Sequence, residues 1–326
     1  MKTIRHTFSR CLMFTGLLLG ALAAQAQAFP DKPITLVVGF PPGGGVDITA
    51  RQIAGGLSKE LGQQVVVENR AGAAGNIAMS QVARARPDGY VLLVGNLGML
   101  SANPFLYSKL SFDATKSFSP IARLVAVPLI AATPAGAPAK DLKGFIDQGK
   151  ARPGELFFGS GGSGNINHLA GELLKQQTGA SLVHVPFQGS APALNALIAN
   201  QVQLVIDGAN LLQPQLAGGR IHALATTGEK RLASLPDVPT MAEVGLPGMT
   251  IYGWQGLLAP TGTPPEVIEK LSKAVEKVLA DPAVKAKFAE QGADVAYQPP
   301  AAFADYIAAE QKRWRTVIQS AGIKVE

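Results

Sequence analysis

Residues 37–51 read Val-Val-Gly-Phe-Pro-Pro-Gly-Gly-Gly-Val-Asp-Ile-Thr-Ala-Arg, an order that predicts a buried strand, a glycine-rich loop and a helix. The β-branched run from Ile34 to Phe40 is typical of a strand covered on both faces. Two prolines and three glycines end the strand, because proline lacks a ladder donor and glycine adopts angles that other residues avoid. Apolar residues then recur at helical spacing from Val46 to Leu61. The start of that helix offers unpaired N–H groups, which suit an anion.

The spacing of the glycines argues against a nucleotide as this anion. A P-loop needs Lys and Ser or Thr after its last glycine, where this chain has Val46 and Asp47. A dinucleotide fingerprint needs a third glycine at the position of Ile48. Asp47 suits a helix cap, an ion pair with Arg51 or a donor on the ligand better than a phosphate. A small carboxylate fits this loop best, although most glycine-rich turns are structural only.

The N-terminus has the pattern of a secretory signal peptide. A basic segment precedes an apolar run from Cys11 to Ala24, which is too short to span a bilayer. Small residues mark cleavage points near Ala26 or Ala28, so we expect residues 1–28 to be removed and the protein to reach the periplasm. Three basic residues and no acidic ones are lost with them, which lowers the net charge from +6 to +3.

The exported part has a composition that excludes several functions. It contains no cysteine, which rules out disulfides, iron–sulfur clusters and thiol catalysis. Its Lys and Arg residues are not clustered with aromatic ones, so no nucleic acid is expected as a partner. We also expect no metal and no cofactor, because the three remaining histidines stand far apart and no zinc-binding helix pattern occurs.

The order of predicted elements indicates two α/β lobes. Strands near 34–40, 64–69 and 90–95 alternate with helices, and the same order returns from residue 155 onward. Apolar segments at 121–132 and 251–259 predict two crossings between these units. We therefore expect a two-lobed, type II-like (Venus-flytrap) periplasmic binding protein with parallel-type sheets. The expected division is lobe 1 at 29–128 plus 250–326, and lobe 2 at 129–249.

Ligands of such folds bind in the crevice at the C-terminal ends of the strands. The loops that would converge there are 40–47, 96–99, 159–165, 187–190 and 207–209. Between Phe40 and Asp47, Gly159 and His168, and Phe187 and Pro192, the chain contains no Lys or Arg. A carboxylate would therefore be held by N–H groups, hydroxyls and helix N-termini.

The chain resembles the solute-binding receptors of tripartite tricarboxylate transporters, the Bug-type receptors. The likeness covers nearly all of the exported chain and rests on a succession of short motifs. These are Phe-Pro-Pro-Gly-Gly-Gly-Val-Asp (40–47), Gly-Asn (95–96), Asn-Pro-Phe-Leu-Tyr (103–107), Gly-Ser (159–160) with His-Leu-Ala-Gly-Glu (168–172), His-Val-Pro-Phe-Gln-Gly-Ser-Ala-Pro-Ala-Leu (184–194), Leu-Pro-Asp-Val-Pro-Thr (235–240) and Gly-Leu-Leu-Ala-Pro (256–260).

The resemblance implies a monomeric periplasmic receptor that closes on a small carboxylate and serves the membrane subunits of such a transporter. In this family, backbone amides of the loops after the first strand of each lobe grip the ligand, helped by ordered water. The ligand-binding residues implied here are Phe40, Gly43, Gly44, Gly45, Val46, Asp47 and Asn96 in lobe 1, and Ser160, Gly161, Ser163, Gly164, Asn165, His168, Gly189, Ser190 and Asp207 in lobe 2. Asn165-Ile166-Asn167 departs from the Ser/Ala-rich loop expected of the family, which leaves the solute open.

Two other functions stay open at this level. A periplasmic partner that presents its ligand to a sensor kinase would have the same fold. A hydrolase is a weaker alternative: Gly161-Gly162-Ser163-Gly164-Asn165 would be a nucleophile elbow only with glycine at 165. A Ser-His-Asp triad built from distant residues would still be compatible with the sequence. His184, in an expected buried strand, is interpreted as structural, and Asp207 as either a helix cap or a contact to a ligand hydroxyl or amine.

Overall fold

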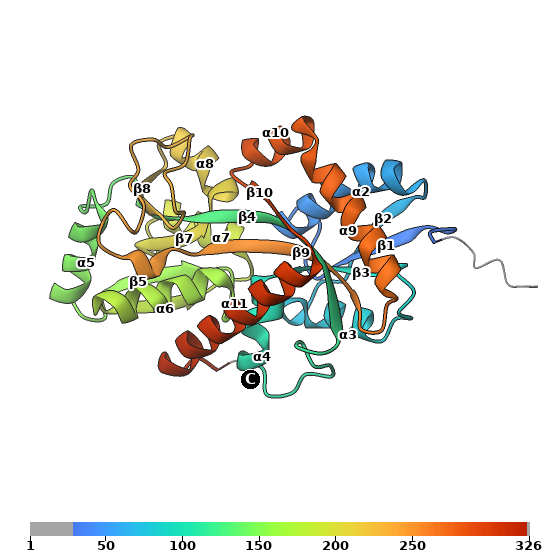
Figure 1. The fold of residues 1–326 in the computed structure, drawn as a ribbon. Helices are drawn as coiled ribbons and strands as arrows, with labels where there is room; N and C mark the ends of the chain where they lie inside the picture. The colour runs from blue at the N-terminus through green and yellow to red at the C-terminus, as the bar shows by residue number, and fades with distance from the viewer. Residues whose placement is uncertain (1–28, 325–326) are drawn as a thin grey trace, which may run out of the picture.

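A computed structural model describes residues 29–324, and the predicted signal peptide with its cleavage point lies outside this range. The described residues form two α/β lobes that share long strands, as Figure 1 shows. Lobe 1 is the part built on strands β2, β1 and β3, and lobe 2 is the part built on β6, β5 and β7. The two-lobed α/β fold that the sequence predicts is confirmed.

Lobe 1 contains a parallel sheet because helices connect its strands. β1 lies between β2 and β3, and both neighbours run parallel to it. α2 follows the glycine-rich loop and buries an apolar face that includes Val46, Ile53 and Leu57, which the helical spacing places on one side. The elements are β1 (Ile34–Val38), α2 (Gly45–Leu61), β2 (Val65–Asn69), η1 (Ala73–Gly75), α3 (Asn76–Ala83), β3 (Val91–Asn96), η2 (Gly98–Ala102) and α4 (Asn103–Leu106).

Lobe 2 repeats this arrangement, with β5 between β6 and β7 and all three strands parallel. β5 and β6 each lead through a short loop into a helix, and β7 passes directly into α8. Because parallel strands end at the same edge of a sheet, the starts of α6, α7 and α8 gather at that edge. The elements are α5 (Leu142–Ala151), β5 (Leu156–Ser160), α6 (Ile166–Thr178), β6 (Leu182–Pro186), α7 (Ser190–Ile198), β7 (Leu204–Gly208), α8 (Ala209–Ala217) and β8 (Ile221–Thr226).

Two long strands connect the lobes, as predicted. β4 (Phe118–Pro134) runs from lobe 1 to lobe 2, and β9 (Tyr252–Pro260) returns. Since they cross in opposite directions, they pair antiparallel, and each also pairs antiparallel with a strand of a lobe. The expected parallel pairing is present among β1, β2 and β3 and among β5, β6 and β7, and the sheet is mixed where the crossing strands and β8 join it antiparallel.

The pairing partners of β4 change in the middle of the strand. Pro128 pairs with Tyr252 of β9, and the next residue, Leu129, pairs with Gly208 of β7. The division into residues 29–128 plus 250–326 and residues 129–249 remains a proposal, with one boundary at this change of partner.

The last helix, α11 (Pro300–Ser320), lies along the crossing strands and reaches lobe 2 (Figure 1). Its buried Glu310 accepts hydrogen bonds from the indole N–H groups of Trp254 in β9, at 3.3 Å, and Trp314, at 3.1 Å. The guanidinium of Arg123 in β4 stacks 4.0 Å from the ring centre of Tyr306. α11 thus contacts both crossing strands. The remaining elements are η3 (Pro247–Met249), α9 (Pro265–Ala280), α10 (Pro282–Glu290) and β10 (Asp294–Gln298).

Candidate functional site

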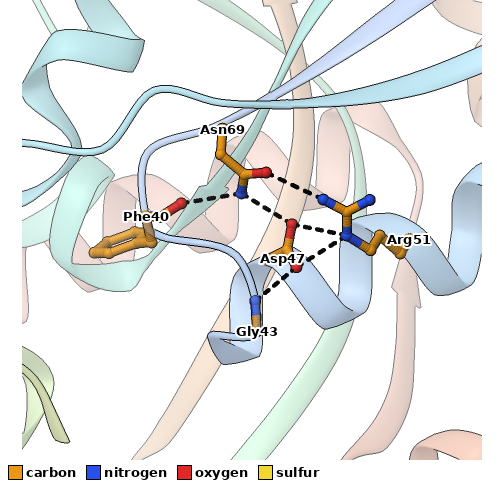
Figure 2. Close-up of polar contacts among 5 residues, drawn as sticks. All are labelled: Phe40, Gly43, Asp47, Arg51 and Asn69. Atoms are coloured by element: carbon orange, nitrogen blue, oxygen red, sulfur yellow. Dashed lines mark hydrogen bonds and ion pairs between the residues drawn. The ribbon is translucent and has the colours of Figure 1, made fainter.

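The carboxylate of Asp47 holds the glycine-rich loop of lobe 1 in place, as Figure 2 shows. One oxygen accepts the N–H of Gly43 at 2.9 Å, the other accepts Nδ2 of Asn69 at 2.9 Å, and Nε of Arg51 lies 3.0 Å from both. Asn69 also donates to the carbonyl of Phe40 at 3.0 Å. Asp47 is buried, and donors of its own lobe occupy both of its oxygens. This geometry supports a positioning role for Asp47.

The charge of Asp47 is compensated where it lies. Burial raises the pKa of Asp47, but the hydrogen bonds from Arg51, Gly43 and Asn69 outweigh burial and lower the pKa below its usual value. Asp47 therefore stays ionised at neutral pH beside a guanidinium, and the start of α2 remains suitable for an anion. Gly44 is the residue before α2 and Gly45 its first residue, while the side chain of Val46 belongs to the core and leaves only its backbone for contacts.

Asn96 ends β3 at the same edge of the lobe 1 sheet. Its Oδ1 accepts the N–H of Met99 at 3.0 Å, and its register partner on β9 is Gln255. The turn at residues 72–75 packs on this edge, because a Cβ on Gly39 would lie 2.7 Å from the Cα of Gly75. This turn was not among the predicted site loops, although it follows a strand as they do.

The loop after β5 is held by hydrogen bonds within lobe 2. The N–H of Gly164 donates to Nδ1 of His168 at 3.0 Å, and Nδ2 of Asn165 donates to the carbonyl of Gly161 at 2.8 Å. Ser163 is exposed at the tip of the loop. A Cβ on Gly161 would lie 2.9 Å from the backbone nitrogen of Ser190, so glycine is required for this loop to approach the start of α7.

Two stacked histidines support this loop from behind. The rings of His168 and His184 lie 3.7 Å apart with an angle of 9° between them. Nε2 of His184 lies 2.6 Å from Oγ of Ser160, and the carboxylate near the stack, Glu172, lies 3.8 Å from Nε2 of His168. Burial lowers the pKa of His168 to about 3 and that of His184 to about 4, so both rings are neutral at pH 7.

The contact between Ser160 and His184 bears on the hydrolase alternative. Ser160 is fully buried, and its hydroxyl also lies 3.1 Å from the carbonyl of Gly162. A nucleophile must be reachable by its substrate, and its base is oriented by a third group. Here the serine is covered and the nearby carboxylate approaches the other histidine. This geometry supports a structural role for the pair in the loop.

Asp207 is the second-to-last residue of β7, near the point where the loops of lobe 2 meet. It is buried, and its Oδ1 accepts the N–H of Gly208 at 2.7 Å. Within residues 29–324, its Oδ2 receives no hydrogen bond. Burial raises the pKa of Asp207, and the neutral groups of Ser190, Gly208 and Asn167 partly oppose this shift. Gly189 and Ser190, at the start of α7, thus lie in the same cluster as Asp207.

The two lobes approach each other at Asn210 and Gln255, which were not among the predicted site residues. A Cβ on Gly45 of lobe 1 would lie 3.5 Å from Nδ2 of Asn210 in α8 and 3.8 Å from Nε2 of Gln255 in β9. Asn210 follows Asp207 closely in sequence, and Gln255 is the register partner of Asn96. Of the sequence-predicted residues, Gly45 thus lies where the two lobes approach each other, next to Asn210 and Gln255. That the whole predicted set binds a ligand stays a prediction.

Four helices start at the carboxyl-end edges of the lobe 1 and lobe 2 sheets without a side-chain cap. In the described structure, no side chain caps α2, α6, α7 or α8. Asp141 and Asp281 cap α5 and α10 by accepting the N–H groups of Gly144 and Ala283, whereas α3, α9 and α11 also start without a side-chain cap. The first N–H groups of the four helices therefore remain open to another acceptor.

Other features of the described residues lie away from these edges. Two surface hollows of about 270 and 380 Å³ are lined by lobe 2 residues, such as Phe145 in one and Leu235 in the other. Between residues 29 and 324, the His, Asp and Glu side chains form no group of three that could hold a metal. Over the same range, no helix has the length and apolar character needed to cross a bilayer.

Solved structures show the class of protein to which this fold and site belong. Rpa4515 of R. palustris, solved with adipate, has a TM-score of 0.84 at 36% identity and covers 91% of this chain and 99% of its own. MatC of Rhodopseudomonas palustris, solved with bound malate, has a TM-score of 0.80 at 35% identity, with coverage of 89% and 100%. BugD, solved as a periplasmic binding protein, has a TM-score of 0.81 at 35% identity, with coverage of 91% and 100%. The protein is thus a periplasmic solute-binding protein.

Sequence comparison identifies the family. The profile described as tripartite tricarboxylate transporter family receptor matches residues 49–323, and the chain belongs to this family. BugT of Bordetella pertussis (strain Tohama I) is 35% identical over 307 residues, 94% of each chain. The UPF0065 protein in the tcbD-tcbE intergenic region of Pseudomonas sp. (strain P51) is 37% identical over 297 residues, 91% of this chain and 88% of that one. The resemblance to the Bug-type receptors is confirmed.

Proposed function

We propose that the protein captures a small organic carboxylate between its lobes and delivers it to the membrane subunits of a tripartite tricarboxylate-type transporter. The observation that carries this proposal is the set of uncapped helix starts, α2 from lobe 1 and α6, α7 and α8 from lobe 2, at facing edges of the two sheets. Structural neighbours solved with adipate and malate support the choice of a carboxylate.

The helix starts explain how an anion is bound without a cationic side chain. Each offers roughly 0.3–1 kcal/mol to a nearby anion, and up to about 2 kcal/mol when partly buried. Micromolar affinity requires about 8 kcal/mol, which is more than the helix ends supply in water. Closure of the lobes would exclude water and strengthen each charge-assisted hydrogen bond. Affinity therefore depends on both lobes acting together.

A thermal-shift screen of the purified protein tests capture. The protein is first stripped of retained solute by partial unfolding and refolding. Its melting temperature is then measured with mono-, di- and tricarboxylates and with their neutral amides. We expect selective stabilisation by a carboxylate, of about 2.7 kcal/mol at 100 times its dissociation constant. Equal stabilisation by the matching amide, no response to any carboxylate, or chemical conversion of the solute would contradict the proposal.

A glycine variant ties binding to the facing edges. Gly161→Ala places a Cβ 2.9 Å from the backbone nitrogen of Ser190, which pushes the loop after β5 away from α7. We expect affinity for the selected carboxylate to fall at least about ten-fold, or about 1.4 kcal/mol. Gly136→Ala, also in lobe 2, meets no atom within 4 Å and serves as the control. Delivery is tested separately, by uptake into vesicles that contain the membrane subunits, with and without the receptor.

A further inference from the structure

The carboxylate of Asp207 is a buried acceptor with one oxygen unused. The residue is 7% exposed, and the N–H of Gly208 engages Oδ1 at 2.7 Å. Within residues 29–324, no donor meets Oδ2 at ordinary hydrogen-bond distance and angle, although the Ser190 hydroxyl and the Asn167 amide lie near enough to lower the pKa of the carboxyl. A buried acceptor left unpaired costs free energy, so native structures leave few of them and usually for a reason.

Among residues 29–324, no cationic side chain acts on the carboxyl of Asp207 to compensate its burial. Besides burial, the groups that act on this carboxyl are the Ser190 hydroxyl, the Gly208 backbone and the Asn167 amide, all of them neutral. Asn167 itself donates to the carbonyl of Ile206 at 3.2 Å. The three polar neighbours belong to the starts of α6, α7 and α8, so the carboxylate lies where these uncapped helices converge.

The same corner of lobe 2 faces lobe 1. The side chain of Asn210, three residues after Asp207, lies over Gly208: a Cβ added to Gly208 would be 2.5 Å from Oδ1 of Asn210. Its Nδ2 lies 3.5 Å from the position of a Cβ on Gly45, at the start of α2. Asp207 therefore belongs to the segment of lobe 2 that approaches lobe 1.

We propose that Asp207 selects carboxylates that carry a hydrogen-bond donor, a hydroxyl or ammonium group, on their carbon chain. This inference rests on the proposed function. The helix starts bind the carboxylate of such a solute, and Oδ2 of Asp207 accepts the hydrogen bond from its substituent. A site built to bond an O–H or N–H group rejects the analogue that lacks it, because the buried partner is then left unpaired.

Isothermal titration calorimetry on the stripped, purified protein tests this selection with solutes matched in length. The sets are succinate, malate and aspartate; glutarate, 2-hydroxyglutarate and glutamate; and adipate, 2-hydroxyadipate and 2-aminoadipate. We expect the hydroxy or amino member of the preferred length to bind at least ten-fold more tightly than the unsubstituted acid. Whichever of the hydroxy and amino acids binds more tightly shows whether Asp207 accepts its hydrogen bond from a hydroxyl or from an ammonium group. Equal or tighter binding of the unsubstituted acid would overturn the inference and leave carboxylate capture intact.

The variant Asp207→Asn reverses the polarity of the free position. Gly208 N–H holds the oxygen at the Oδ1 position, so the amide nitrogen takes the place of Oδ2 and becomes a donor. We expect the preference for the substituted solute over the unsubstituted acid to fall to three-fold or less. Asp147→Asn, which alters an exposed ion pair with Lys143 on α5, should keep the full preference.

The remaining outcomes also decide the question. A preference that survives in Asp207→Asn would show that another residue selects the substituent, and the inference would be wrong. If the variant does not fold, as judged by circular dichroism, the matched solutes on the unaltered protein decide alone. Failure of every carboxylate to bind would refute the proposed function itself, and the selection by Asp207 with it.

Discussion

His168 makes the loop of lobe 2 depend on a neutral imidazole. Its Nδ1 accepts the N–H of Gly164 at 3.0 Å, and a protonated ring could not accept this hydrogen bond. Burial, followed by the nearby His184 and Lys175, lowers the pKa of His168 to about 3 from an ordinary value of 6.5. The folded protein therefore resists protonation at a position where the unfolded chain accepts a proton readily.

This difference predicts how stability depends on pH. Between pH 6.5 and about 3 the unfolded chain binds more protons at His168, so the free energy of unfolding falls as the pH falls. Above pH 6.5 this contribution is fully present and constant. We expect His168→Gln to reduce the slope by up to about 1.4 kcal/mol per pH unit in urea unfolding at pH 7, 6 and 5. Parallel stability curves for variant and unaltered protein would contradict this account.

Sequence spacing identified the residues of the loops but not the direction of their side chains. Asp47 and Arg51 stand four apart on a helix, and their ion pair forms as that spacing allows. That Asn69 and Gly43 also occupy the Asp47 carboxylate depends on how β2 lies beside β1. The stacking of His168 on His184, sixteen positions apart, likewise requires the parallel pairing of β5 and β6.

At the scale of elements, α11 connects to both crossing strands through buried polar contacts. Glu310 is the shared acceptor of the two tryptophans, one in β9 and one in α11 itself. Removing its carboxylate leaves two buried N–H donors unpaired, each at a cost of about 1–3 kcal/mol. We therefore expect Glu310→Ala to lower the free energy of unfolding by at least about 2 kcal/mol, measured by urea unfolding followed by circular dichroism.

A second glutamate provides the matched control for this prediction. Glu269 pairs with Lys273 on α9, and both side chains are more than 60% exposed, at 66% and 68%. Exposed pairs of this kind contribute about 0–1 kcal/mol, so Glu269→Ala should change stability little. If both variants lost the same stability, the acceptor role of Glu310 would be refuted.

Hydrophobic spacing and helix-start signals predicted most elements, but not all. α2 and α11 follow from apolar stripes in the sequence. A helix after Asp207 was expected only under the interpretation of that residue as a helix cap, and the bounds of α8 were not predicted, because Pro214 interrupts a short segment with a weak apolar pattern. The antiparallel pairing of β4 with β9 was missed as well, since an apolar run does not show the direction in which its partner crosses.

At the scale of the whole molecule, one close contact joins the lobes beside the crossing strands. A Cβ on Gly292, between α10 and β10, would lie 3.0 Å from Cβ of Ala209 and 3.2 Å from the nitrogen of Asn210, both in lobe 2. We expect Gly292→Ala to hold α8 away from lobe 1. The radius of gyration from X-ray scattering with ligand present should increase, and carboxylate affinity should fall, although no ligand contact is removed.

Gly322→Ala separates this effect from backbone strain. Gly292 and Gly322 have φ values of 66° and 64°, so alanine carries a similar left-handed penalty of about 1–2 kcal/mol at each position. A Cβ on Gly322 meets no atom within 4 Å, so the control should lose stability without any change in the distance between the lobes. Equal scattering curves for the two variants would contradict a role of the Gly292 contact in lobe approach.

The sequence by itself determined the class of fold, the family and the loops of the candidate site. These follow from local chemistry: glycine and proline end strands, apolar spacing defines helices, and the motifs occur in a fixed order along the chain. Only the tertiary structure decided that α8 and β9 bring Asn210 and Gln255 opposite Gly45, and that Asp207 keeps one buried oxygen unpaired. Such facts arise from the burial and approach of distant segments, on which local spacing carries no information.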